Sequence, residues 1–447
     1  MPGCAWLWGY TVDDALITAR VAVHIVRGLG SRFNPHGPAA DAVTPLGYAH
    51  LLATFGRSDV LQMFLVAKWF GLGAWLTAAA LLGRRIASIG SHARRFTPLS
   101  VVALSAPLAA WAVSGMETGF VTLLTTLGLF DGLLGAACLG MAAAWRPELL
   151  PFACALAAGR VLVAGRAPRT AIAFAVCTLV PTLIVGLLRW HAFGRAVPLS
   201  FYAKPSDFAH GLRYALGAFA FTGLPWLLLA TPREFKRLPR EARPLFAALL
   251  AHGAALVLCG GDWMALFRLA VPVLPACALA AAYLAEQARL AFAIPRLLLA
   301  LGGALVLAIG LGPSARQVGS QRTQLIARAR PVLARDTRIA TLDVGWVGAA
   351  SNADVIDFAG VTDPEVALFP GGHTSKRIPA AWLFARSPSA VVLLLARGAE
   401  LQTPFEDSVF ARAVEQRVAT LIAAEFRVRT RLALGDQTYV VLEPSER

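Results

Sequence analysis

Two adjacent aspartates, Asp13 and Asp14, are the first residues in the chain whose types suit catalysis. They precede an amphipathic stretch, 15–27, whose apolar residues recur at the spacing of a helix lying along a lipid–water interface. A carboxylate in such a place can serve as a general base, and a second carboxylate can orient it. The alternative is structural, because aspartates also cap helix N-termini and interact with the helix dipole.

Three more charged residues lie between apolar runs. Glu117 lies in the segment SGMETG, where an ionisable group at a bilayer boundary is costly and therefore a functional candidate, although it could also belong to a helix cap. Arg146 and Glu148 flank Pro147 in the segment WRPE. Proline at a helix start explains the geometry, and an ion pair between its neighbours is the alternative to a role in binding.

Two further segments combine aromatic and charged residues. Tyr202 and Lys204 lie in AVPLSFYAKP, where the lysine is either a phosphate contact or a side chain that reaches toward the membrane surface. Asp262, Trp263 and Arg268 lie in CGGDWMALFR, after two glycines that interrupt a helix. The tryptophan is typical of a membrane interface, and the charged pair near a helix end indicates a polar site.

The last candidate segment is PGGHTSKR, which contains His373 and Lys376. A glycine-rich turn that leads into a helix N-terminus beside basic residues suits an anion. An ordinary surface turn is nearly as good an explanation. Together the candidates predict one polar site on one side of a membrane, and they include residues for donor phosphate and substrate binding as well as a base.

The composition predicts the elements that must position these residues. Of the 447 residues 57% are hydrophobic and only 15% are charged, against about 25% in soluble proteins. This excludes a soluble enzyme, a disordered chain and a disulfide scaffold. Helices are the expected spanning elements, since an open sheet edge cannot be satisfied in lipid. We predict about ten transmembrane helices, near 60–82, 98–113, 117–131, 133–145, 147–164, 170–190, 212–231, 244–259, 268–284 and 294–311.

Basic residues give the predicted orientation. The formal net charge is +15, but the arginines lie in short loops rather than along one basic stripe, so nucleic acid is not an expected partner. Loops with Arg84, Arg85, Arg94 and Arg95, with Arg166 and Arg169, and with the cluster at 233–243 are predicted to be cytoplasmic. The alternate loops, including residues 1–59, and everything after 312 are then extracytoplasmic.

The chain is predicted to have two domains, a transmembrane catalytic domain at 1–312 and an extracytoplasmic α/β domain at 313–447. In the second domain charged residues are frequent, and short β-type runs alternate with helical ones. The predicted strands are 338–342, 354–358, 390–396, 427–434 and 438–442, and the predicted helices are 317–333, 375–386 and 407–424.

The sequence lacks the motifs of several common classes of enzyme. The sequence has no Walker A loop, GxSxG, HExxH or CxxC pattern, and its six cysteines are scattered. Several carboxylates could hold a divalent cation, but no ligand spacing requires one, so a metal and any other cofactor stay open. An outward site without nucleotide chemistry needs an activated substrate, and a lipid-linked phosphosugar is one whose prenyl tail lies in the bilayer.

The segments DDALITARVAVHIVRGLGSRFNP, SGMET, WRPE, SFYAKP, GGDWMALFRLAVPVLP and VIDFAGVTDPEVA…GGHTSKR carry a resemblance. In matching order over nearly the whole chain, they resemble lipid-linked-sugar glycosyltransferases of the GT-C fold, in the branch of the mycobacterial terminal β-(1→2) arabinofuranosyltransferases. The resemblance implies a multi-pass protein of the bacterial inner (plasma) membrane. It also implies a polyprenyl-phosphate sugar donor, a glycan or glycolipid acceptor, and Asp13 or Asp14 as the catalytic base.

The family has a transmembrane helix before its DD motif, and this sequence has none at that place. The sequence therefore predicts either a misplaced start or a shortened copy. The alternative to an enzyme is a secondary transporter or lipid flippase, which would place ionisable groups at mid-membrane, where only Lys68 lies here. A third alternative, a structural assembly protein, would not require the outer carboxylates.

Overall fold

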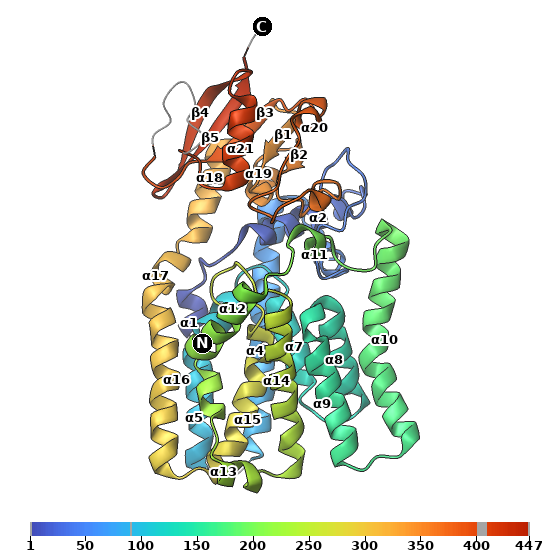
Figure 1. Cartoon of the computed structure of the whole chain (residues 1–447), viewed down its shortest axis with the longest axis vertical. Helices are drawn as coiled ribbons and strands as arrows, with labels where there is room; N and C mark the ends of the chain where they lie inside the picture. The colour runs from blue at the N-terminus through green and yellow to red at the C-terminus, as the bar shows by residue number, and fades with distance from the viewer. Residues whose placement is uncertain (1, 90–91, 400–408, 446–447) are drawn as a thin grey trace. The chain divides into compact units, whose positions relative to one another are not determined.

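The computed structural model describes residues 2–89, 92–399 and 409–445, and for 92–96 it describes the backbone alone (Figure 1). The chain packs as two compact units, each built from separate stretches. The helical unit comprises Met1–Thr11, Ala67–Leu188 and Ser206–Gln317, and the mixed unit comprises Val12–Val66, Arg189–Pro205 and Val318–Arg447. The mixed unit therefore combines the C-terminal α/β region with two stretches that precede it in the chain.

Helices form in all ten apolar stretches of the prediction. The helical unit contains α1 (Pro2–Trp6), most of α4 (Val60–Ala87), α5 (His92–Leu104), α6 (Ala106–Ala112), α7 (Thr118–Leu127), α8 (Leu133–Trp145), η1 (Pro147–Leu149), α9 (Leu150–Val163), most of α10 (Pro168–Phe193), α12 (Phe208–Phe221), η2 (Leu224–Leu228), α13 (Pro232–Arg237), η3 (Arg240–Ala242), α14 (Arg243–Leu258), η4 (Val271–Val273), α15 (Leu274–Gln287), α16 (Leu290–Gly310) and α17 (Gly312–Ala315).

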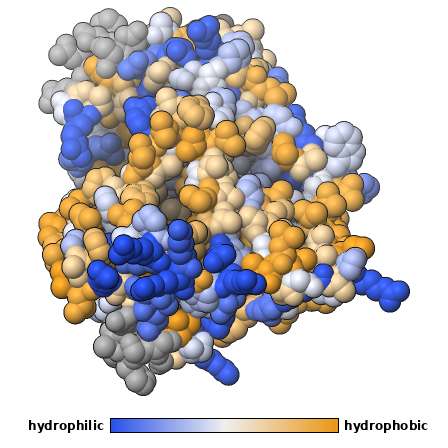
Figure 2. All heavy atoms as spheres, turned by 60° about the horizontal axis from the view of Figure 1, so that its bottom comes forward, coloured by the Kyte–Doolittle hydropathy of each residue, from blue (hydrophilic) through white to orange (hydrophobic). Residues whose placement is uncertain are grey.

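Four helices among the described residues are long and apolar enough to cross a membrane: Val60–Ala87, Pro168–Phe193, Arg240–Leu258 and Leu290–Gly310. Their outer faces carry large exposed apolar side chains, such as Leu183 and Leu187 on α10 and Leu298 on α16. Figure 2 shows hydrophobic residues over much of the visible surface. Because water would penalise so large an apolar surface, the chain is a multi-pass membrane protein.

Other apolar helices are shorter, and their ends have local causes. The predicted span near 98–113 is divided at Ser105, whose hydroxyl accepts a hydrogen bond from the N–H of Leu108 (3.4 Å) and caps α6. The helix α7 ends at Leu127, where the guanidinium of Arg160 donates to the carbonyls of Gly128 and Leu129, each at 2.7 Å. A cation at a helix C-terminus is favourable, so this contact fixes where α7 stops.

Basic residues gather at one end of the helical unit, where α13 lies at the bottom of Figure 1. The segment through α13 and η3 carries the exposed residues Arg233, Lys236, Arg237, Arg240 and Arg243. A group of hydrophilic residues is visible on the forward-turned face in Figure 2. Side chains of Arg94 and Arg95, which belong to the same prediction, lie outside the described part of the chain.

The mixed unit holds a five-stranded sheet and its helices. Its elements are α2 (Asp13–Val26), α3 (Tyr48–Ala53), α11 (Leu199–Ala203), α18 (Val318–Leu333), β1 (Arg338–Thr341), α19 (Val344–Ala350), β2 (Asp354–Asp357), η5 (Val366–Leu368), α20 (Ala380–Ala385), β3 (Ala390–Leu394), α21 (Ala413–Ile422), β4 (Phe426–Leu434) and β5 (Gln437–Pro444).

The sheet order is β2-β1-β3-β5-β4, with β1 parallel to β2 and β3, and β5 antiparallel to β3 and β4. Every residue of β3 is buried, as expected of a central strand covered on both faces. Gly435, at φ 60°, lies in the two-residue turn that joins β4 to β5. The left-handed backbone at this position favours glycine and matches the twist of the hairpin.

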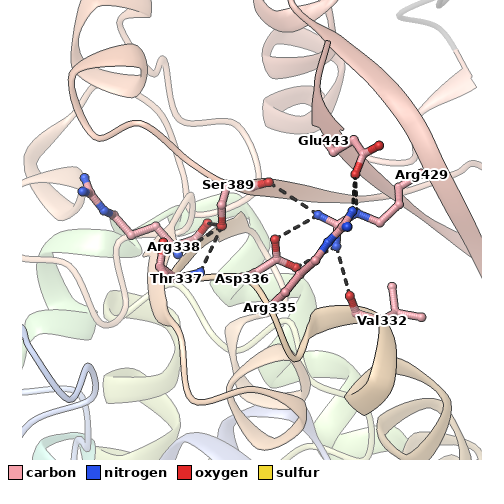
Figure 3. Close-up of polar contacts among 8 residues, drawn as sticks. All are labelled: Val332, Arg335, Asp336, Thr337, Arg338, Ser389, Arg429 and Glu443. Carbon is pink, nitrogen blue, oxygen red and sulfur yellow. Dashed lines mark hydrogen bonds and ion pairs between the residues drawn. The ribbon is translucent and has the colours of Figure 1, made fainter. Parts of the chain in front are cut away.

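An arginine whose side chain is 11% exposed ties the edge strand β4 to the sheet (Figure 3). The guanidinium of Arg429 donates to both carboxylate oxygens of Asp336 (2.7 and 2.9 Å), to Glu443 (2.9 Å) and to the carbonyl of Val332 (3.0 Å). The arginine therefore links β4 and β5 with the turn that connects α18 to β1. Arg335, by contrast, makes an exposed ion pair with Glu443.

All five predicted strands are confirmed, and the predicted helix 317–333 is α18. The predicted helix 375–386 is wrong in its first half, because the helix begins at Ala380. Pro379 precedes it in an extended conformation, and a proline also disfavours helical geometry in the residue before it. The predicted helix 407–424 is α21 over Ala413–Ile422, and residues 407–408 lie outside the described residues.

Candidate functional site

The aspartate pair begins α2, but it does not cap that helix. The N-cap residue is Val12, and no side chain makes a capping hydrogen bond there. Instead Asp13 accepts hydrogen bonds from the N–H of Gly345 (2.7 Å, to Oδ2) and the N–H of Trp346 (3.0 Å, to Oδ1). The carboxylate therefore binds the first turn of α19. Neither aspartate is the N-cap residue of α2, but both lie in its first turn, where the helix dipole favours a negative charge.

The position of Asp13 changes its acidity. Burial raises the pKa of Asp13 to about 6, although the positive charge of Arg322 and the N–H of Gly345 act in the opposite direction. The nearby carboxylates of Asp343 and Asp14 add to the rise. Asp13 is thus fixed at both oxygens and titrates close to neutral pH.

Asp14 is the more open of the two aspartates. Its Oδ2 lies 4.0 Å from Nζ of Lys204, and the two side chains are 32% and 25% exposed. The two residues are far apart in sequence, and both belong to the mixed unit. A carboxylate and an ammonium group that stay in contact with solvent are available to a substrate, which a fully buried pair is not.

The short helix α11 positions Lys204. Leu199 and Ala203 of this helix are buried against Ala367, with Tyr202 partly buried beside them. The hydroxyl of Ser200 lies 3.0 Å from that of Thr44. Apolar packing and a side-chain hydrogen bond therefore hold α11 in place. They fix the backbone of Lys204, which follows the last residue of this helix.

An ion pair holds residues 189–205 against residues 41–44. Arg189 Nε lies 2.9 Å from Asp41 Oδ2, and both side chains are almost fully buried. The same guanidinium donates to the carbonyl of Thr44. Because an unpaired buried charge would be costly, this contact joins residues 41–44 to the last part of α10.

A buried polar network lies behind Asp13 that the sequence did not reveal. Arg322 donates to the hydroxyl of Tyr439 (3.1 Å), and that hydroxyl donates to Oδ2 of Asp343 (2.6 Å). Arg412 donates to both oxygens of Asp343 (3.0 and 2.8 Å) and to Glu415 (2.6 Å). One available signal was the place of Asp343 just after the parallel strand β1, where functional groups gather in such sheets.

In the helical unit the structure brings Glu117, Arg146 and Glu148 together. Arg146 Nε lies 2.8 Å from Glu117, and Arg146 Nη1 lies 3.6 Å from Glu148. Glu117 and Arg146 are buried at 1% and 4% exposure. The predicted ion pair of Arg146 with Glu148 is present, and this group sets two carboxylates against one guanidinium.

The second polar group of the helical unit is Asp262 with Arg268, 2.8 Å apart. The guanidinium lies over the ring of Trp111, 5.7 Å from its centroid, and the indole N–H of Trp111 donates to the carbonyl of Leu266. Leu266 has a positive φ of 62°, a strained conformation for leucine. Strain of this kind persists only where the surroundings fix the backbone, and it occurs often at functional sites.

Trp263 lies beside this group but points elsewhere. Its ring stacks on that of His210 at 4.0 Å, and its side chain is 64% exposed. An exposed indole agrees with the interfacial role that the sequence predicted.

His373 and Lys376 lie in the mixed unit, in a turn rather than at a helix start. The N–H of Gly372 donates to the hydroxyl of Ser375 (3.1 Å), and α20 begins only at Ala380. Lys376 is buried, and its ammonium group donates to the carbonyls of Ala367 (2.7 Å) and Phe369 (2.9 Å). These contacts fasten the loop and use two of the three donors of the ammonium group.

Among the described residues, no group of three or more histidine, cysteine, aspartate and glutamate side chains is arranged to hold a metal ion. The polar groups that do assemble are carboxylates paired with lysine or arginine. Their chemistry is proton transfer and the binding of negatively charged groups.

Residues 315–442 match a protein family described as a domain of unknown function, DUF8728. The match covers most of the C-terminal α/β region. A search of curated proteins finds no match to the chain.

The network behind Asp13 gives a prediction for stability. Burial alone would raise the pKa of Asp343, but the charge and hydrogen bonds of Arg412 outweigh it and hold the pKa well below the usual range. The substitution D343N should therefore destabilise the mixed unit by about 3 kcal/mol at pH 7. Pulse proteolysis of the full chain in urea measures this loss.

The sign of the pH dependence follows from the lowered pKa. Stabilisation by Asp343 is present above the pKa of the unfolded chain, about 3.9, and is lost as the pH falls toward the folded value. The gap between wild type and D343N should therefore shrink below pH 4. As a control, E365Q removes an exposed ion pair with Arg386 and should cost less than about 1 kcal/mol. A D343N protein as stable as E365Q would contradict the role of the network.

Proposed function

We propose that this protein is a membrane glycosyltransferase that moves a sugar from a polyprenyl-phosphate donor to a glycan or glycoconjugate on the outer face of the membrane. In this proposal it has a GT-C-like fold with about ten transmembrane helices. The observation that carries the proposal is the contact of Asp14 with Lys204 beside the fixed carboxylate of Asp13. A base and a phosphate-binding cation are the two groups that such a transfer needs first.

Asp14 is the better candidate for the general base, because it is the more accessible carboxylate of the pair. It would take the proton of an acceptor hydroxyl as the hydroxyl oxygen attacks the anomeric carbon. The bond from that carbon to the phosphate oxygen breaks, and the prenyl phosphate leaves with the electron pair. A single displacement of this kind inverts the anomeric configuration.

Asp13 would act through its neighbour, as a positioning residue. Because both of its oxygens accept backbone N–H groups of α19, it fixes the first turn of α2 and with it the backbone of Asp14. General-base catalysis contributes roughly 10²–10⁴-fold, so positioning and charge stabilisation must supply most of the remaining acceleration.

Lys204 would stabilise the negative charge that develops on the leaving phosphate. A lysine offers a compact point charge with three donors, which suits a phosphate whose oxygens move during the reaction. A role of Arg146 and Arg268 in phosphate binding stays a prediction. Each of these arginines is paired with a carboxylate of the helical unit, and that carboxylate would compete with a phosphate.

The apolar helices support the rest of the proposal. Four long helices supply a surface for the bilayer, in which the prenyl chain of the donor would lie. The exposed basic residues of α13 and η3 favour the cytoplasmic side for that end of the helical unit. In this proposal the C-terminal region is extracytoplasmic, as the alternation of basic and non-basic loops in the sequence predicts.

Asparagine substitutions separate the two aspartates. We expect D14N to lower kcat for sugar transfer by more than about 100-fold, because the amide cannot accept the proton. D13N should lower kcat less, since an amide keeps one of the two contacts with α19. The measurement is transfer in proteoliposomes with a panel of polyprenyl-phosphate sugars.

The matched control is D436N, which changes an exposed aspartate in the β4–β5 turn that pairs with Arg397. It should transfer sugar at the wild-type rate. Wild-type rates in both D13N and D14N would overturn the assignment of the base, and no transfer from any donor of the panel would overturn the proposed function.

Replacing Lys204 tests the phosphate contact. We expect K204Q to raise the KM for the donor by about tenfold or more, because a charge-assisted hydrogen bond to phosphate is lost. The KM for the acceptor should change by less than about twofold, since only the donor carries the phosphate. The exposed Lys236 offers a control, K236Q, and an unchanged donor KM in K204Q would exclude the role.

A further inference from the structure

A polar cavity lies within the mixed unit, and it is lined by residues other than Asp14 and Lys204. Its volume is about 590 Å³, and it is lined by parts of α2, the start of α4, the end of α18 and the end of α19. The side chains that give it its character are Arg20, His24, Arg27, His36, Asp59 and Arg330. Such a volume suits a ligand of the size of one or two sugar rings.

Two arginines at the edge of this cavity are accessible. Arg27 is exposed and donates one hydrogen bond, to the carbonyl of Ser58 (2.8 Å). Arg330 is 46% exposed and lies 3.2 Å from Asp59, which is itself 41% exposed. Exposed ion pairs of this kind are weak, so a stronger anion can displace the carboxylate. The edge therefore carries two positive charges against one negative charge.

Arg20 differs from Arg27 and Arg330 because it is buried and its guanidinium binds backbone carbonyls. Its guanidinium donates to the carbonyls of Phe33 (2.9 Å), Gly348, Ser351 (2.9 Å) and Ala353 (2.7 Å). These bonds hold the wall of the cavity at the end of α19. Arg20 adds positive potential but has few donors left for a ligand.

His24 also lines the cavity and adds an uncharged polar group. His24 is buried, and burial lowers the pKa of its ring to about 4. At neutral pH the ring is therefore uncharged, and its Nδ1–H donates to the carbonyl of Arg32 at 3.0 Å. In that tautomer Nε2 is an acceptor, which suits a hydroxyl group.

We infer that this cavity binds a phosphorylated polyol or sugar, with Arg27 and Arg330 on the phosphate and His24 among the groups that contact hydroxyls. Arginine forks match the oxygens of a phosphate. The ligand can come from a lipid headgroup or from a free sugar phosphate, since both present a phosphate on a hydroxylated body. This inference needs no sugar transfer, so it stands apart from the proposed function.

Calorimetry on the full-length protein in detergent tests the inference. Glucose 1-phosphate and glycerol 1-phosphate should bind, and glucose should not bind measurably. The substitutions R27Q and R330Q should each weaken binding by about tenfold or more. Because both side chains are exposed, neither variant should melt at a lower temperature than wild type.

The matched control is R335Q, which removes an exposed arginine that pairs with Glu443 outside the cavity (Figure 3). It should bind glucose 1-phosphate as tightly as wild type. Equal binding by wild type and the R27Q/R330Q double variant would overturn the inference. So would a lack of binding by both phosphates, or equally tight binding of glucuronate, which carries a carboxylate instead.

Nanodiscs distinguish the two sources of the ligand. If the ligand is a lipid headgroup, phosphatidylglycerol nanodiscs should abolish the binding of glycerol 1-phosphate that phosphatidylcholine nanodiscs permit. If it is a free sugar phosphate, glucose 1-phosphate should bind equally in both. Either result supports the inference, and a loss of binding in both kinds of nanodisc would overturn it.

Discussion

Two charges of opposite sign fasten α2 along α19, and the candidate site depends on this contact. Asp13 accepts from the N–H groups at the start of α19, and Arg20 donates to carbonyls at its end. The two residues are separated by about 10 Å along α2, comparable to the length of α19. The helices therefore run parallel, and each side chain meets the end of α19 whose partial charge attracts it. This contact makes the segment after residue 12 part of the mixed unit, and it fixes the backbone from which Asp14 extends.

Exposure distinguishes the charges that hold the fold from those that are available for chemistry. The pairs Arg146–Glu117 and Arg189–Asp41 are almost fully buried, and each sets a positive charge beside a negative one. Lys68 is also buried; its ammonium group donates to the carbonyl of Tyr10 at 2.9 Å. This contact gives the one predicted mid-membrane charge a structural explanation, so it lends no support to a transporter. Asp14 and Lys204 differ from all of these because both remain partly exposed.

Local patterns in the sequence predict the elements well and their long-range contacts poorly. The five strands follow from apolar runs of strand length, and the helices follow from apolar stretches, because both signals are local. The contact of Asp13 with Gly345 joins positions 332 apart, and nothing in either segment indicates the other. Arg20 was part of a predicted interfacial helix, but residues 15–24 of α2 are buried in the protein. Lys376 shows the same limit of local patterns. Its residue type indicated an anion site, but in the structure its ammonium group donates to two backbone carbonyls.

Amide hydrogen exchange in the full-length protein in detergent tests the fastening of α2 most directly. The variants are D13N and R20Q, and the control is R27Q, which changes the next arginine of the same stretch. If the two charges hold the helices together, exchange in α2 and α19 should become at least about tenfold faster in both variants, since each loses more than 1.4 kcal/mol of local stability. R27Q should leave both helices as protected as in wild type. Unchanged protection of α2 and α19 in D13N and R20Q would contradict the account.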